Sequence, residues 1–116
     1  MTKETIMFKD DNHERRYCEI LGKMKSHDVY HAALAYLLAL DGNIQGKRLS
    51  ECFDFSEDSI KPNVLDAAWI TGTDRRVLQL AFNLWNNAQP ANVSDVFGTG
   101  SDIEYLLEAV RIRFGE

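Results

Sequence analysis

The pattern of hydrophobic and polar positions along the chain predicts helices. In three stretches, apolar residues recur three and four positions apart, which is the spacing of one buried helical face; these are residues 11–25, 74–87 and 101–116. A fourth stretch, residues 30–40, is apolar on every side. A helix that is apolar all round is normally a buried helix, so we predict that residues 30–40 form the centre of the fold.

Polar residues mark the predicted helix starts. Asp11 with Glu14, and Ser101 with Glu104, have the three-residue spacing of a capping box. Ser26 is a third candidate cap, ahead of the central apolar stretch. We therefore expect helices to begin at or just after these residues.

The middle of the chain is less regular. Apolar residues at helical spacing predict one or two turns over residues 47–53. The alternation over Phe53–Phe55 also suits a strand, but there is no second strand signal to pair with it, so we predict a helix followed by a turn. Pro62 is expected to open a short helix that runs through Trp69, and residues 93–97 to form a single turn.

Together these segments predict an all-α fold, a compact bundle of about five helices around the central apolar helix 30–40. One domain is expected to span residues 1–116, with residues 1–8 disordered or only loosely docked. The predicted helix 74–87 is apolar on more than one side, and a second copy of the chain would cover that surplus. We therefore expect a homodimer.

The composition is that of an ordinary globular domain. The chain has 116 residues, of which 45% are hydrophobic and 27% are charged, enough for one conventional core. Its net charge is −5, whereas proteins that neutralise phosphates usually present a basic surface. The charge therefore disfavours nucleic acid as the main partner.

The sequence also indicates a cellular compartment. Its longest apolar run, residues 32–40, is about half the length of a membrane span, and there is no apolar secretory signal near residue 1. Cys18 and Cys52 are too few for a disulfide scaffold, and we predict that both are reduced and buried, with a bridge between them as the alternative. We expect a cytoplasmic protein that does not bind membranes.

His27 and His31 form the most suggestive chemical motif. Two histidines four positions apart on one helix point the same way, as in helical zinc sites. The pattern lacks an evident third ligand, and polar residues at the start of a helix explain it equally well. We therefore predict no cofactor, and keep a metal-dependent hydrolase using His27 and His31 as an alternative.

Two further features point to partners. Arg75 and Arg76 lie in the first turn of a predicted helix, where cations oppose the helix dipole, so an anionic partner such as nucleic acid is one interpretation. Trp69 precedes a break at Gly72 and, if exposed, would mark a protein-binding surface. Core packing of Trp69 and solvation of the arginines are the plainer alternatives.

Three segments carry a resemblance to a known family: SHDVYHAALAYLLAL (26–40), CFDF (52–55) and IKPNVLDAAWITGTDRRVLQLAFNLWNN (60–87). Together they resemble a family of short proteins of unknown function from Firmicutes, some of them encoded near mobile elements. The W-x-T-G-T…A-F-N-L-W arrangement is the most specific part, and residues 101–116 lie outside the similarity. The resemblance implies a bacterial or phage protein and carries over no catalytic residue.

We therefore predict a non-enzymatic protein-binding or regulatory module of a bacterium, phage or mobile element, with Trp69, Arg75 and Arg76 as candidate contact residues. No nucleophile motif supports an enzyme. A nucleic-acid-associated regulator using Arg75 and Arg76 is the first alternative.

Overall fold

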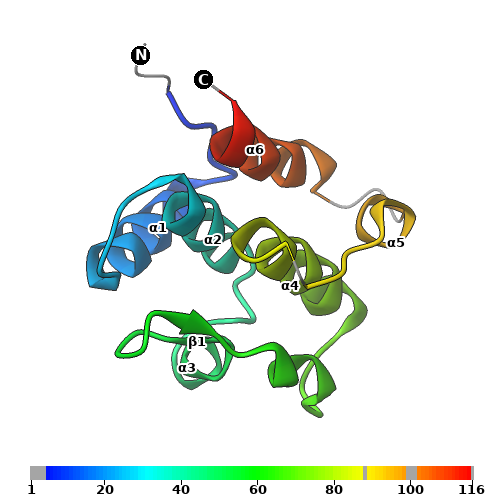
Figure 1. The fold of residues 1–116 in the computed structure, drawn as a ribbon. Coiled ribbons are helices and arrows are strands. Elements are labelled where there is room, and N and C mark those ends of the chain that lie inside the picture. The colour runs from blue at the N-terminus through cyan, green and yellow to red at the C-terminus, as the bar shows by residue number, and fades with distance from the viewer. Residues whose placement is uncertain (1–4, 88, 99–101, 116) are drawn as a thin grey trace.

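The chain forms three tiers in the computed structural model, which describes residues 5–87, 89–98 and 102–115. In order, its elements are α1 (Asp11–Lys23), α2 (Val29–Leu40), α3 (Lys47–Cys52), β1 (Phe53–Asp54), β2 (Ser59–Ile60), the 3-10 helix η1 (Pro62–Asp66), α4 (Gly72–Trp85), α5 (Val93–Phe97) and α6 (Ile103–Phe114). Figure 1 shows α6 above, α1, α2 and α4 in the middle, and α3 with the strands and η1 below. The predicted all-α bundle is confirmed.

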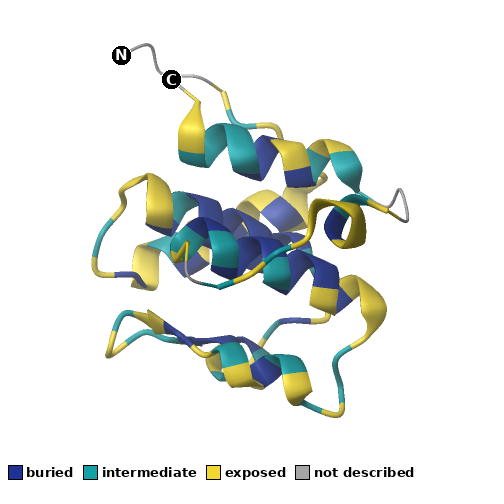
Figure 2. Cartoon of the chain, turned by 45° about the vertical axis from the view of Figure 1, so that its right-hand side comes forward, coloured by how far each residue is buried: buried dark blue, intermediate teal, exposed yellow. Residues whose placement is uncertain are grey.

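Helix α2 is the centre of this arrangement. Every residue from Ala33 to Ala39 is 0% exposed, and α2 packs against α1, α4 and α6. Figure 2 shows the buried residues concentrated in the middle tier. The prediction of a central buried helix is therefore confirmed, except that Tyr30 lies in its first turn and is 43% exposed.

The helices begin close to the predicted positions, but with different caps. Asp10 caps α1 and Asp28 caps α2, because each carboxylate accepts the backbone N–H three residues on. The predictions of Asp11 and Ser26 as caps were therefore wrong by one and two residues. Helix α6 begins after Asp102, which has a left-handed backbone and makes no side-chain cap; the predicted cap Ser101 lies outside the described residues.

The predicted short helix over residues 47–53 is present as α3, but the segment after it corrects the prediction of a turn in place of a strand. Phe53 pairs with Ile60 in a short antiparallel hairpin, β1–β2. The Asp54 carboxylate accepts the backbone N–H groups of Ser56 and Glu57 and so holds the connecting turn. Each strand has only two residues, which is too short to give an alternating pattern that the sequence would reveal.

The short helix predicted from Pro62 is a 3-10 helix that ends at Asp66, before Trp69. The single turn predicted at residues 93–97 is present as α5. Arg76 of α4 donates to the carbonyl of Val96 at 3.0 Å and so ties α5 to α4.

The N-terminal segment is docked, and this corrects the prediction for the described residues 5–8. The backbone N–H of Met7 donates to Glu108 of α6 at 2.9 Å, and the Tyr36 hydroxyl of α2 donates to the Met7 carbonyl. Buried His13 continues the link, since its Nδ1 lies 3.0 Å from the N–H of Lys9 and its Nε2 lies 3.0 Å from the Tyr36 carbonyl. Residues 1–4 lie outside the described part of the chain.

The two cysteines are both free, but only Cys52 is buried. Cys18 is exposed on α1, so its predicted burial was wrong. Within the described residues, no helix combines the length and apolar character that crossing a bilayer requires.

We expect replacement of a buried α2 side chain to be costly. Leu34 is 0% exposed, so Leu34→Ala removes its contacts on all sides and should lower the free energy of unfolding by about 2–5 kcal/mol. Val93 is 72% exposed, and Val93→Ala should change it by less than about 0.5 kcal/mol. Urea denaturation of both variants checks this, and similar losses in the two would contradict a core centred on α2.

Candidate protein-binding groove

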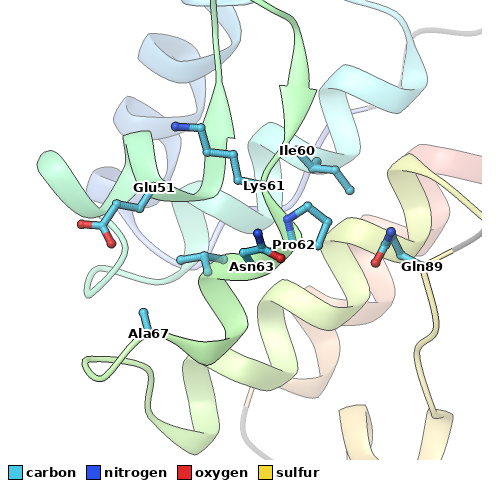
Figure 3. Close-up of a pocket in the computed structure, with 8 residues that line it drawn as sticks. Glu51, Ile60, Lys61, Pro62, Asn63, Ala67 and Gln89 are labelled. Carbon is cyan, nitrogen blue, oxygen red and sulfur yellow. The ribbon is translucent and has the colours of Figure 1, made fainter.

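A groove with a volume of about 750 Å³ lies in the lower tier, beside η1. It is lined by Glu51, Ile60, Lys61, Pro62, Asn63, Val64, Ala67 and Gln89. Figure 3 shows Gln89 on one side of Pro62, and Asn63 and Ala67 of the η1 segment on the other. Segments that are far apart in sequence therefore build one concave surface.

The lining combines apolar and hydrogen-bonding groups. Ile60, Pro62, Val64 and Ala67 provide aliphatic surface, and Asn63 and Gln89 each provide an amide with both donors and an acceptor. Glu51 and Lys61 add one negative and one positive charge. This mixture suits an occupant that presents an aliphatic side chain together with polar backbone groups.

Trp69 lies beside the groove and is held by two contacts. Its indole N–H donates to the Glu51 carboxylate at 3.1 Å, and the Arg48 guanidinium lies over its ring, 4.9 Å from the centroid. The side chain is half-buried and packs against the core. The candidate contact residue Trp69 is therefore an aromatic side chain fixed next to Glu51, at the edge of the groove.

The polar edges of the groove are also anchored. Lys61 donates through Nζ to the carbonyl of Ser50 at 2.8 Å, which fixes the ammonium group near the end of α3. Asn83 of α4 donates to the backbone carbonyl of Gln89 at 2.7 Å and so holds the loop that carries the Gln89 side chain. A groove fixed on both sides loses little conformational entropy on binding.

The groove has two ionisable side chains in its lining, Glu51 and Lys61. Its described lining contains no hydroxyl, thiol or imidazole. Cys52, in the neighbouring α3, is fully buried, and burial raises the pKa of its thiol to about 12, so the reactive thiolate is scarce at neutral pH.

The two candidate arginines do not form a joint surface. Arg75 is exposed, but Arg76 is only 8% exposed and its guanidinium donates to Val96. Neither residue lines the groove. The adjacency of Arg75 and Arg76 in the sequence does not reveal that Arg76 packs inward.

The two candidate histidines are also separated. Because α2 begins at Val29, His27 lies before the helix and is exposed, so the helical metal-pair geometry does not arise. His31 is buried, with Nδ1 2.7 Å from Asp28 and Nε2 2.9 Å from Asp58. Burial opposes its charged form, but hydrogen bonds to the two aspartates outweigh burial and raise the pKa of His31.

His31 thus ties the β1–β2 turn to the start of α2, with both ring nitrogens already engaged. Among the described residues, no group of three or more histidine, cysteine or acidic side chains is placed to hold a metal ion.

A buried acid pair links α2 to α4. Asp41 Oδ2 and Asp74 Oδ1 are buried and no donor group is bonded to either, and the two carboxyls face each other so that a proton on one of them allows a hydrogen bond between them. Asn43 and Thr71 donate to the other oxygen of Asp74 and favour its charged form. Burial and the neighbouring Asp74 therefore raise the pKa of Asp41, which holds the proton, although nearby Arg16 opposes this rise.

Fold and groove together describe a small all-α domain with a concave surface that hydrogen bonds anchor. Comparison with protein families matches residues 3–116 to a family of unknown function, DUF6075, and the chain belongs to this family. The resemblance to an uncharacterised family is thereby confirmed, and it extends through the C-terminal helix. No curated protein and no solved structure matches the chain.

Sequence reasoning singled out Trp69 but not the groove beside it. Glu51, Lys61, Asn63 and Gln89 share no motif, because they come from α3, the η1 segment and the loop after α4. The K-P-N string at residues 61–63, a break rich in polar groups just ahead of Trp69, was the available signal.

The acid pair predicts a pH-dependent difference between the wild type and Asp41→Asn. The wild type needs the Asp41 proton in the folded state only, so this contribution to stability is fully present below the unfolded pKa and is lost as pH rises through the folded pKa. The variant donates to Asp74 at every pH. As the pH rises from 4 to 8, the free energy of unfolding of the variant should therefore increase relative to that of the wild type, by at most about 1.4 kcal/mol per pH unit.

Urea denaturation at several pH values measures this difference. Comparing the two proteins at each pH cancels the contributions of His13 and His31, which titrate in both. A difference that stays constant from pH 4 to 8 would contradict a shared proton.

Proposed function

We propose that the protein is a non-enzymatic, regulatory protein-binding module, and that the groove beside Trp69 holds an exposed chain segment of its partner. The observation that carries this proposal is the lining itself: aliphatic surface and two amides, with no hydroxyl, thiol or imidazole. Recognition of a peptide needs these features, because each backbone unit offers a donor and an acceptor next to a side chain.

The groove suggests how such a segment binds. An aliphatic side chain of the partner packs on Ile60, Pro62 and Val64 and leaves water. The amides of Asn63 and Gln89 hydrogen-bond to the partner's backbone. Trp69, which Glu51 and Arg48 already hold in place, adds rigid apolar surface at the edge.

We further propose that this module acts in the cytoplasm of a bacterium, as a host protein or as a product of a phage or mobile element. The similarity of residues 26–40, 52–55 and 60–87 to short Firmicutes proteins supports this context. One of these segments, 60–87, builds most of the groove, since Ile60, Pro62 and Val64 all lie in it.

Site-specific photo-crosslinking in Firmicutes cells tests the proposal. A photoreactive amino acid replaces Asn63 in the groove or, as the control, the equally exposed Asn12 of α1. We expect a discrete product with a second protein from position 63 and none from position 12. The same products from both positions, no product from position 63, or only a product with a second copy of the chain would overturn the proposal.

A pair of adjacent alanines gives a matched test of the groove. Ala67 lines it, whereas Ala68 is exposed outside it. Ala67→Arg fills the groove with a charged side chain and should reduce the position-63 product by about ten-fold or more, the effect of losing over 1.4 kcal/mol of binding. Ala68→Arg should leave the yield unchanged, and urea denaturation should show both variants folded; equal yields from the two would contradict binding in the groove.

A further inference from the structure

We propose that the outer face of α6 is a dimer interface, on which α6 of a second copy of this chain packs in the antiparallel direction. Helix α6 forms the upper tier, with α2 and α4 below it (Figures 1 and 2), and the N-terminal segment contacts it through the Met7–Glu108 hydrogen bond. This surface is separate from the groove of the lower tier, so the inference does not rest on the proposed function.

The outer face of α6 carries an apolar stripe. Ile103, Leu107, Val110 and Phe114 follow one another at intervals of four, three and four residues, which is the heptad spacing that keeps one side of a helix against a partner helix. Leu107 is 54% exposed and Phe114 is 62% exposed. The inner face of the same helix is closed by Leu106 and Ala109, and Val110 also packs partly against the core, so Leu107 and Phe114 are the exposed members of the stripe.

Other exposed apolar side chains lie near α6. Met7 is 43% exposed and is joined to α6 through its hydrogen bond to Glu108. Tyr30 is also 43% exposed, and the Arg113 guanidinium lies 3.9 Å from its ring centroid and 4.4 Å from that of Phe114. Four of the six large apolar side chains that are exposed among the described residues therefore gather on or beside α6.

The charges beside the stripe favour a second copy as the occupant. Glu104 and Arg111 flank it on the same side, seven residues apart, and Arg111 is held in place by donating through Nε and Nη2 to Glu108 of the same helix. In an antiparallel pair that sets Leu107 against Val110, and Ile103 against Phe114, Glu104 of each copy lies beside Arg111 of the other. The stripe and charges of one copy are thus complementary to the same stripe and charges of a second copy, as a two-fold interface requires.

The oligomeric state of the full chain tests this proposal. Sedimentation equilibrium over a wide concentration range should give a wild-type mass that rises from that of the monomer to that of the dimer. Leu107→Asp places a carboxylate in the stripe and should raise the dissociation constant by about 30-fold or more. Val93→Asp changes a 72% exposed side chain on α5 and should leave the constant unchanged.

Charge exchange tests the antiparallel direction. Glu104→Arg places two cations side by side across the interface and should weaken the dimer by about ten-fold, and adding Arg111→Glu should restore the attraction. Circular dichroism confirms that each variant is folded. A monomeric wild type at all concentrations, equal effects of Leu107→Asp and Val93→Asp, or no recovery on charge exchange in a folded protein would overturn the proposal.

Discussion

The burial of α2 on every side is the constraint on which the rest of the structure depends. A helix without a polar face is stable in water only if other elements cover it, and α1, α4 and α6 do so. Three helices around a fourth leave the lower side to shorter pieces, and α3, the hairpin and η1 occupy that side (Figure 1). The groove exists because these short elements meet at angles instead of packing as continuous helices.

The same constraint explains why polar groups are buried at the edges of the core. The ends of a fully covered helix are themselves close to being buried, so the polar residues there need partners inside the protein. At its start, His31 bridges Asp28 and Asp58; at its end, Asp41 shares a proton with Asp74 of α4. These contacts join α2 to the turn of the hairpin and to the capping box of α4, and so align the tiers.

Features of the fold that depend on local interactions could be predicted from the sequence, whereas those that depend on contacts between distant segments could not. Helix α4 was recognisable because its apolar period is local, although its Thr71–Asp74 capping box starts the helix at Gly72, two residues before the predicted start. The hairpin was not, because its strands have two residues each and depend on pairing across the turn. Trp69 could be suspected, but Gln89 could not, since only the tertiary fold brings the loop after α4 beside η1.

The groove and the outer face of α6 lie in opposite tiers, and this separation links the two proposals (Figure 1). Pairing through α6 buries the upper face of each copy and leaves both grooves open at the far ends of the dimer. A dimer of this kind holds two partner segments at a fixed separation, and binding of one raises the effective concentration of the other. A moderate affinity at each small groove is then sufficient for a stable complex with a partner that is itself repeated or dimeric.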